Sequence, residues 1–299
     1  MHVGMIGLGR MGAAMSERLR KQKHKVVVYD RNAARVKAAV KKGARGAGSL
    51  SQVIQQLPSP HVVWIMVPAG GPTAAVLRGL ESHLQAGDII IDGGNSYYRD
   101  SVERARTFKQ AGIYFLDAGV SGGVWGLREG YCLMVGGEKA ALQKAEPLFR
   151  ALAPKDGYAH VGPSGAGHFA KMVHNGIEYG MLQAYGEGFE LLAAAEEFKL
   201  DLHQLAALWN HGSVIRSWLL ELAASALRKD RRLRKIRGYV EDSGEGRWTI
   251  EDAVARAVPV TAIAHSLFAR FATRQKDSFS AKLIAALRQE FGGHAVKKG

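Results

Sequence analysis

The 299-residue sequence predicts an α/β protein, with a doubly wound parallel sheet in the first half and an all-α second half. Short runs rich in Val and Ile alternate with helix-like stretches up to about residue 163, as in a sheet whose strands are joined by crossover helices. Such runs are typical of strands that are covered on both faces. Strand patterns nearly vanish after this point. We therefore expect a first domain over residues 1–163 and a helical domain over residues 164–299.

The individual elements follow from the apolar periodicity along the chain. We expect strands over residues 2–6, 25–29, 61–67, 88–92, 114–117 and 131–135. Helices are expected between them, over residues 12–23, 32–42, 72–84 and 100–111. The second half predicts helices over residues 165–198, 201–210, 213–227, 249–271 and 278–291. A stretch rich in Gly, Asp and Glu, residues 238–247, predicts an internal loop.

Composition and targeting patterns indicate a soluble cytoplasmic protein. The single cysteine, Cys132, excludes an internal disulfide and fits a reducing compartment. It lies in an apolar stretch, so we expect a buried structural thiol. The chain begins with a short strand pattern and a glycine loop, without a secretory signal. It has no apolar run long enough to cross a bilayer, so we expect no membrane partner.

The net charge of +14 predicts an anionic partner, for which phosphorylated small molecules, dinucleotides and nucleic acid all qualify. The densest basic run spans residues 228–237. It lacks interleaved aromatic residues for base stacking, and no nucleic-acid-binding motif surrounds it. We interpret this run as a solvated face and expect no nucleic-acid partner.

A glycine-rich loop, G-x-G-x-x-G at residues 7–12, follows the first strand and opens the first helix. Gly7 permits a tight turn, Gly9 lets the backbone approach a pyrophosphate, and Gly12 lets helix and strand pack closely. The helix N-terminus offers amides and a positive dipole end to the anion. A purely structural turn is the alternative, but the strand, the helix and a later Asp favour a Rossmann-type dinucleotide site. The expected cofactor-binding residues are Gly7, Leu8, Gly9, Arg10, Met11, Gly12, Asp30, Arg31, Val67, Pro68 and Asn95.

The end of the second strand bears on the choice between the two nicotinamide cofactors. A carboxylate at Asp30 accepts hydrogen bonds from the adenosine ribose hydroxyls and repels a 2′-phosphate, which favours NAD. The neighbouring guanidinium of Arg31 could receive that phosphate instead. We therefore expect NAD as the cofactor, with NADP possible.

A polar stripe follows one face of the helix expected at residue 165 onward. Lys171, His174, Asn175 and Glu178 fall at positions i, i+3, i+4 and i+7, so a helix places them on one face. The other faces carry apolar residues: Phe169, Ala170, Met172, Val173 and Ile177. A buried charge is costly unless it is paired or functional, so the stripe predicts a face toward a ligand-filled cleft. A solvated helix with a Lys–Glu pair is the alternative.

The segment KMVHNGIEY at residues 171–179 resembles the catalytic helix of 6-phosphogluconate dehydrogenases. Two earlier segments, DGGNS at 92–96 and GVSGG at 119–123, resemble other family motifs in the expected order. Further segments of this kind are GRWT at 246–249, VPVT at 258–261, FAR at 268–270 and RQEFGGH at 288–294. The short chain resembles the family's short branch, whose members often prefer NAD. It departs from the long members at Arg247, where they usually carry Lys.

The resemblance implies oxidative decarboxylation of 6-phosphogluconate to ribulose 5-phosphate and CO2, a step of the pentose phosphate pathway. Lys171 is then the general base at the C3 hydroxyl, a role that needs a neutral amine, and burial or nearby cations lower the pKa of an amine. Its protonated form afterwards stabilises the enolate oxygen, and Glu178 delivers a proton to C1. His174 and Asn175 orient substrate hydroxyls. The residues expected around the substrate carboxylate and C2 are Asn95, Ser121, Gly122 and Gly123.

The phosphate end of the substrate needs strong hydrogen-bond donors. The resemblance points first to Arg270, supported by Tyr179 and Arg247. Arg288 and His294 match family residues that reach the phosphate from a neighbouring subunit, which implies a homodimer or homotetramer with shared active sites. A plain surface charge is the alternative for Arg288.

Two rival functions remain open at the level of the sequence. A β-hydroxyacid dehydrogenase acting on a small unphosphorylated acid shares the dinucleotide fold, a Ser-Gly-Gly turn and a Lys followed four residues later by Asn. Such relatives do not usually carry residues equivalent to His174 and Glu178, nor the Arg-rich tail motif. A noncatalytic basic scaffold is the second rival. The His, Asp and Glu residues show no convincing metal-ligand spacing, so we expect no metal.

Overall fold

A computed structural model of the chain describes residues 1–297. The chain divides into two compact units, Met1–His174 and the residues from Asn175 onward. The division falls inside one continuous helix, α8 (Ala166–Ala194). The domain boundary expected near residue 163 stays a prediction.

The first unit is built around a single sheet, which has eight strands within the described residues. The strands are β1 (His2–Ile6), β2 (Lys25–Tyr29), β3 (Arg45–Gly46), β4 (Val62–Ile65), β5 (Ile89–Asp92), β6 (Tyr114–Ser121), β7 (Cys132–Gly136) and β8 (Tyr158–Gly162). Their order across the sheet is β3-β2-β1-β4-β5-β6-β7-β8, which reverses direction outward from β1 and β4. Neighbouring strands are parallel except for β6 and β7, which pair antiparallel.

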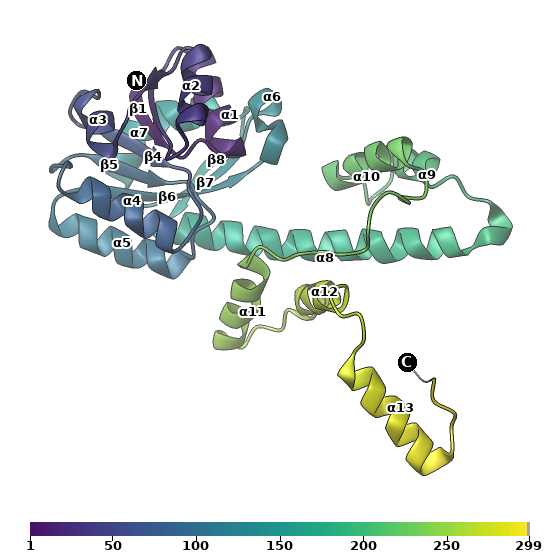
Figure 1. Ribbon diagram of the computed structural model, residues 1–299. Coiled ribbons are helices and arrows are strands. Elements are labelled where there is room, and N and C mark those ends of the chain that lie inside the picture. The colour runs from purple at the N-terminus through teal and green to yellow at the C-terminus, as the bar shows by residue number, and fades with distance from the viewer. Residues whose placement is uncertain (298–299) are drawn as a thin grey trace. The chain divides into compact units, whose positions relative to one another are not determined.

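Helices cover both faces of this sheet (Figure 1). They are α1 (Arg10–Lys21), α2 (Ala33–Lys41), α3 (Leu50–Gln55), α4 (Gly71–Glu81), α5 (Tyr98–Gln110), α6 (Gly126–Glu129) and α7 (Lys139–Leu152), with a short 3-10 helix at Gly123–Trp125. One core cluster joins the sheet to α1 and α7, through Met15 and Phe149. The other joins it to α3, α4 and α5, through residues such as Val53, Leu77 and Phe108. Burial on both faces explains the continuous Val and Ile runs of the central strands.

The predicted fold class is confirmed, but the elements of this unit differ from the expectation in several places, and the short elements β3, α3 and α6 were not predicted. The sheet is not wholly parallel, because β7 runs against β6. Helix α7 was not predicted, and Pro147 lies inside it. Strand β8 was also missed, since its side chains are mostly exposed and form no apolar run. The expectation of a buried Cys132 is wrong: it begins β7 and is exposed, whereas the next residue, Leu133, is buried.

All regular secondary structure in the described part of the second unit is helical. After a 3-10 turn at Glu196–Phe198, its helices are α9 (Leu202–Leu208), α10 (Trp218–Lys229), α11 (Glu245–Ala255), α12 (Thr261–Ala272) and α13 (Phe279–Gly292). A small core joins α9 and α10 through Leu202, Ala206, Leu220, Ala224 and Leu227. By contrast, α13 contains no buried residue.

Two predictions for the second unit are corrected. The single helix expected over residues 249–271 is two helices, because Ala257 adopts a positive φ of 55° and Pro259 lacks the N–H that a helix needs. The loop expected over residues 238–247 ends earlier, at Gly244, so Arg247 lies on the first turn of α11. Within the described residues, no helix is long and apolar enough to cross a membrane.

Candidate active site

The glycine-rich loop has the geometry of a dinucleotide-binding turn. Gly7 has a φ of +93°, and a Cβ there would collide with the carbonyl oxygen of Met66. A Cβ at Gly12 would collide with the carbonyl oxygen of Gly7, so the first turn of α1 lies directly on the loop. At Gly9 a Cβ would meet no atom within 4 Å, and no side chain caps the helix there. The loop therefore leaves open space and free helix amides where an anionic ligand can approach.

Asp30 closes this loop from the end of β2. Its carboxylate accepts hydrogen bonds from the backbone N–H of Leu8 at 2.7 Å and of Asn32 at 2.8 Å, and Arg35 lies 3.5 Å away. Burial raises the pKa of Asp30, but the hydrogen bonds from Asn32 and Leu8 and the charge of Arg35 outweigh it, so the net pKa lies below its usual value. The neighbouring Arg31 is exposed. The structure thus presents a fixed, ionised carboxylate beside an unrestrained guanidinium.

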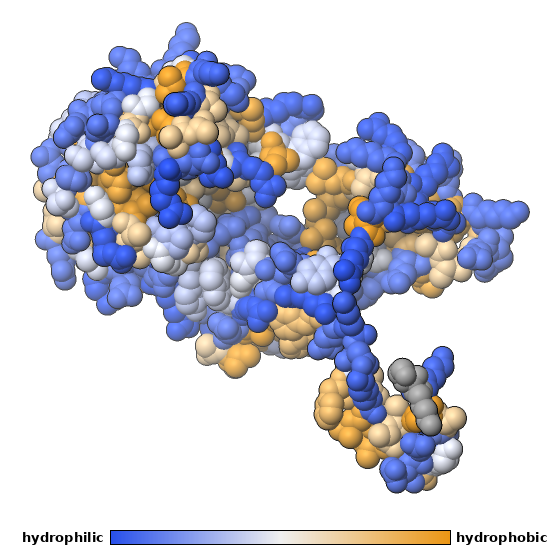
Figure 2. Space-filling view, viewed as in Figure 1, coloured by the Kyte–Doolittle hydropathy of each residue, from blue (hydrophilic) through white to orange (hydrophobic). Residues whose placement is uncertain are grey.

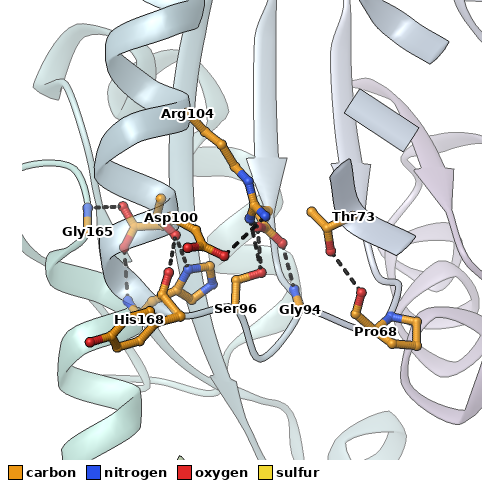
Figure 3. A network of polar contacts seen from close by, with 12 residues as sticks. Pro68, Thr73, Gly94, Ser96, Asp100, Arg104, Gly165 and His168 are labelled. Atoms are coloured by element: carbon orange, nitrogen blue, oxygen red, sulfur yellow. Dashed lines mark hydrogen bonds and ion pairs between the residues drawn. The ribbon is translucent and has the colours of Figure 1, made fainter. Parts of the chain in front are cut away.

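The loops after β4 and β5 complete the expected cofactor-binding set. Val67 lies against both neighbouring loops, because a Cβ at Gly7 would be 2.8 Å from its side chain and a Cβ at Gly94 would be 2.7 Å from its carbonyl oxygen. The carbonyl oxygen of Pro68 accepts a hydrogen bond from the Thr73 hydroxyl at 2.9 Å (Figure 3). The structure therefore brings the three loops together at one end of the sheet.

A buried ion pair shapes the loop that carries Asn95. Asp92 is fully buried at the end of β5 and accepts hydrogen bonds from Gly94 N at 3.1 Å and Ser96 Oγ at 2.8 Å. Arg104 on α5 donates to the same carboxylate at 3.2 Å (Figure 3). Asp92 thus fixes Gly94 and Ser96 on either side of Asn95, whose side chain is exposed at the tip of the loop.

The first part of α8 brings three of the predicted site residues together. Lys171 is 7% exposed, and its Nζ lies 3.5 Å from His174 Nδ1. The other ring nitrogen of His174, Nε2, lies 3.4 Å from Ser121 Oγ at the end of β6. Gly122 and Gly123 follow with φ values of +127° and +52°, which favour glycine and turn the chain sharply after Ser121. A buried amine, an imidazole and a hydroxyl thus form one chain of polar contacts.

In the second unit, Tyr179 is the centre of a further cluster. Asn175 and Tyr179 are buried, at 8% and 4% exposure, and Glu178 between them is partly exposed. The Tyr179 hydroxyl accepts a hydrogen bond from Ser243 N at 3.1 Å. The guanidinium of Arg270 lies 3.4 Å above the Tyr179 ring and donates to the carbonyl oxygen of Glu241 at 3.0 Å. Two of the three residues predicted at the phosphate end are therefore in contact.

Arg247, the third of these residues, forms an ion pair with an acidic residue that the sequence analysis did not predict. It donates to Asp242 at 2.7 Å and 3.2 Å, and Arg274 donates to the same carboxylate. Hydrogen bonds from Arg247 and Arg274 lower the pKa of Asp242 to about 2, against the opposing effect of burial. The four-residue spacing of Arg270 and Arg274 near the end of α12 was the signal that could have pointed to a shared cationic face.

Arg288 and His294 lie at the far end of the second unit, on and just after α13, and both are exposed. The ring of His294 packs edge-on against Phe291. No hydrogen bond, ion pair or ring contact among residues 1–297 joins either of them to Tyr179, Arg247 or Arg270. The structure of one chain does not bring them together with the Tyr179 cluster. The described residues also contain no group of three His, Cys, Asp or Glu side chains that could hold a metal ion.

Comparison with known proteins matches the chain along most of its length. The family model for the NAD binding domain of 6-phosphogluconate dehydrogenase matches residues 2–162, and the model for that enzyme's C-terminal domain matches residues 167–283. A Bacillus subtilis protein, YqeC, whose name assigns it provisionally to this enzyme, is 47% identical, with 100% of both chains covered. The NAD(+)-dependent, decarboxylating 6-phosphogluconate dehydrogenase of Haloferax volcanii is 44% identical over 100% of this chain and 99% of its own.

Solved structures give the same result. The 6-phosphogluconate dehydrogenase of Plasmodium falciparum superposes with a TM-score of 0.84 at 28% identity, covering 100% of this chain and 66% of that one. A Mycobacterium tuberculosis 3-hydroxyisobutyrate dehydrogenase, at 24% identity and a TM-score of 0.73, shares the fold. With both family models matched and full-length relatives above 40% identity, the chain belongs to the 6-phosphogluconate dehydrogenase family.

Proposed function

We propose that this protein oxidises and decarboxylates 6-phosphogluconate to ribulose 5-phosphate and CO2, with NAD as the preferred electron acceptor. The observation that carries the proposal is the buried amine of Lys171, in contact with His174, on the helix that follows a dinucleotide-binding sheet. A buried amine beside an imidazole is suited to proton transfer and is costly as a purely structural feature.

The residues present fit a dinucleotide. The open space at Gly9 and the uncapped amides of α1 suit a pyrophosphate, and the fixed carboxylate of Asp30 suits the ribose hydroxyls. Arg10, Met11, Val67, Pro68 and Asn95 would line the rest of the cofactor. When bound, the nicotinamide accepts a hydride from the substrate. The exposed Arg31 leaves room for NADP as a second acceptor.

Proton transfer would be divided between two residues of α8. Lys171 takes the proton of the C3 hydroxyl during oxidation and, once protonated, stabilises the negative oxygen that develops as CO2 leaves. Glu178 then donates a proton to C1. The two residues are seven positions apart on a continuous helix, which corresponds to about 10 Å along its axis. That separation suits a sugar acid, whose carboxyl end and chain can lie along the helix face.

The remaining predicted residues would bind and orient the substrate. Hydrogen bonds from Ser121, Gly122 and Gly123 would hold the carboxylate and C2 region, together with Asn95, which follows the neighbouring strand β5. His174 and Asn175 would orient hydroxyls. The phosphate would contact the Arg270 and Tyr179 pair, with Arg247 in support, because a guanidinium and a phenol are both strong donors to a phosphate.

We further propose that the active protein is a homodimer or homotetramer in which Arg288 and His294 reach the phosphate site of a neighbouring subunit. Support comes from α13, which carries Arg288 and ends two residues before His294. It buries none of its residues and exposes large apolar side chains. The same proposal places the reaction in the cytoplasm, as a step of the pentose phosphate pathway.

The substrate is tested by following nicotinamide absorbance at 340 nm, roughly the reduced-cofactor maximum, with two acids. We expect turnover of 6-phosphogluconate with release of CO2 and little turnover of 3-hydroxyisobutyrate. Turnover of the small acid alone would instead assign the protein to the β-hydroxyacid dehydrogenases, and turnover of neither would revive a noncatalytic role.

The shared site is tested by complementation. A Lys171→Ala chain and an Arg288→Ala chain are each expected to be poorly active, but mixed oligomers should recover part of the activity, because some sites then combine an intact Lys171 with an intact Arg288. Mixing is verified with two different affinity tags. Verified mixing without recovery would remove the shared-site proposal.

A further inference from the structure

Two buried carboxylates lie side by side in the sheet, one at the end of β5 and one in the middle of β6, and their surroundings differ. Asp92 and Asp117 are register partners on these neighbouring strands, and both are fully buried. Asp92 is neutralised by Arg104 and holds the loop that carries Asn95. Asp117 has no Lys or Arg partner among the described residues. A fully buried charge without a cation is costly, so its hydrogen bonds must have a strong structural role.

The carboxylate of Asp117 accepts hydrogen bonds from backbone amides at the beginning of α8. Its Oδ1 accepts from Gly165 N at 2.6 Å, and its Oδ2 accepts from His168 N at 2.9 Å (Figure 3). Amides at this position have no acceptor within the helix, and they lie at the positive end of the helix dipole, where a carboxylate is stabilised. The His168 side chain adds a second attachment, since its Nδ1 lies 2.7 Å from Ser101 Oγ on α5. The first turn of α8 is thus bonded both to the sheet and to α5.

The same turn lies unusually close to the sheet. A Cβ at Gly119 would be only 2.5 Å from the Cβ of Lys171, and a Cβ at Gly136 would be 2.7 Å from Gly167 N. No side chain therefore separates the helix from β6 and β7 at these points. Because Lys171 follows His168 by three residues, a shift of the first turn carries the amine with it.

We propose that Asp117 is a positioning residue for Lys171: it bonds the N-terminus of α8 to the middle of β6 and so fixes the amine beside His174. The inference rests on the proposed function, in which Lys171 is the general base. Proton and hydride transfer depend steeply on the distance between reacting groups, and a displacement of about 1 Å can lower the rate by roughly 10²-fold.

The first test is Asp117→Asn, which keeps the size of the side chain but turns one acceptor into an N–H donor facing a backbone N–H. We expect kcat to fall by roughly 10- to 100-fold while the KM values for 6-phosphogluconate and NAD change by less than about threefold, since the glycine-rich loop, the Ser121–Gly123 turn and Arg270 do not lie on α8. A wild-type kcat in the folded variant would overturn the proposal.

The matched control is Asp88→Asn. Asp88 is equally buried and precedes β5 at the opposite end of the sheet, where it accepts from His61 N at 2.7 Å and Gln85 N at 2.9 Å. The same chemical change there should lower thermal stability to a similar degree but leave kcat per folded molecule within about twofold of wild type. An equal loss of kcat in both variants would mean that Asp117 acts through general stability only, and the proposal fails.

A kinetic isotope effect separates positioning from loss of folded protein. With substrate deuterated at C3, the isotope effect on kcat should rise in Asp117→Asn, because hydride transfer becomes more rate-limiting when Lys171 is misplaced. A smaller fraction of folded enzyme would leave the isotope effect at its wild-type value. An unchanged isotope effect alongside a reduced kcat therefore contradicts the proposal.

A second variant and a second readout keep the test decisive. If Asp117→Asn does not fold, Gly119→Ala displaces Lys171 from the other side and should give the same pattern of low kcat and retained KM. Amide hydrogen exchange over residues 163–175 should also speed up in Asp117→Asn and not in Asp88→Asn. Failure of the wild-type protein to turn over 6-phosphogluconate would refute the proposed function, whereas unchanged exchange would refute the anchoring itself.

Discussion

The two units of the chain support their site residues in different ways. In the first unit, helices cover both faces of the sheet, and buried carboxylates behind the surface fix the elements that carry Asn95 and Lys171. In the second unit, helix α13 exposes Phe279 to 77% and Phe291 to 78%, and Figure 2 shows apolar side chains gathered on this helix. The first unit therefore packs its helices against its own sheet, whereas helix α13 of the second unit presents apolar surface of the kind that another molecule covers.

The largest effect is expected in the first unit, at the base itself. Lys171→Met should reduce turnover by about 10³-fold or more, because one amine serves both oxidation and decarboxylation. NAD reduction and CO2 release should fall together, while binding of NAD, measured by fluorescence titration, stays close to wild type. Near-normal turnover in this variant would show that the base lies elsewhere.

Two identical substitutions, one in each unit, compare the packing directly. Phe149→Ala removes a fully buried ring from the first core and should lower the free energy of unfolding by about 3–5 kcal/mol. Phe291→Ala removes a mostly exposed ring and should cost less than about 0.5 kcal/mol at concentrations where the chain is monomeric. Urea unfolding followed by tryptophan fluorescence measures both. Equal losses would mean that α13 is packed as tightly as the first core.

The Arg270 side chain tests whether the second unit binds the phosphate. Arg270→Met should raise the KM for 6-phosphogluconate by roughly 10- to 100-fold with a smaller change in kcat, since a charge-assisted hydrogen bond contributes about 1.5–3 kcal/mol. Activity toward gluconate, which lacks the phosphate, provides the control and should hardly change. A similar loss with both acids would indicate that Arg270 supports Tyr179 structurally and does not read the phosphate.

The smallest expected effect concerns the choice of cofactor. Asp30→Ala should weaken NAD binding and improve relative use of NADP, so that the ratio of the two kcat/KM values shifts by roughly tenfold, because the carboxylate that repels a 2′-phosphate is gone. Adding Arg31→Ala to this variant should reverse part of the gain with NADP. If neither substitution moves the ratio, discrimination resides outside the end of β2.

Most of the fold could be predicted because strands that are buried on both sheet faces appear in the sequence as continuous runs of Val and Ile. The runs of residues 2–6 and 25–29 coincide with β1 and β2. Strands without such an apolar run were missed: β8 is mostly exposed, and β3 has only two residues. The break between α11 and α12 was missed because apolar periodicity continues across residues whose backbone departs from the helix.

The grouping of candidate site residues could be predicted where residue types are chemically unusual for their pattern, as with Lys171 and His174, which lie in contact on α8. The supporting residues could not be predicted. Asp117 and Arg104 have ordinary sequence surroundings, and only the fold shows that one bonds to α8 and the other to Asp92. Charges such as that of Arg247 were expected to face a phosphate, but the sequence did not show that Asp242 already pairs with it.

The exposed cysteine at the start of β7 allows the protein to be labelled at a single site. Cys132 is the single thiol of the chain, and it is the register partner of Ser121 at the end of β6. A thiol-reactive fluorophore would therefore attach at one defined position beside the Ser121–Gly123 turn, without any engineered cysteine. Its emission would report ligand arrival at that turn in real time, and labelling of the Lys171→Met variant would follow substrate binding in the absence of turnover.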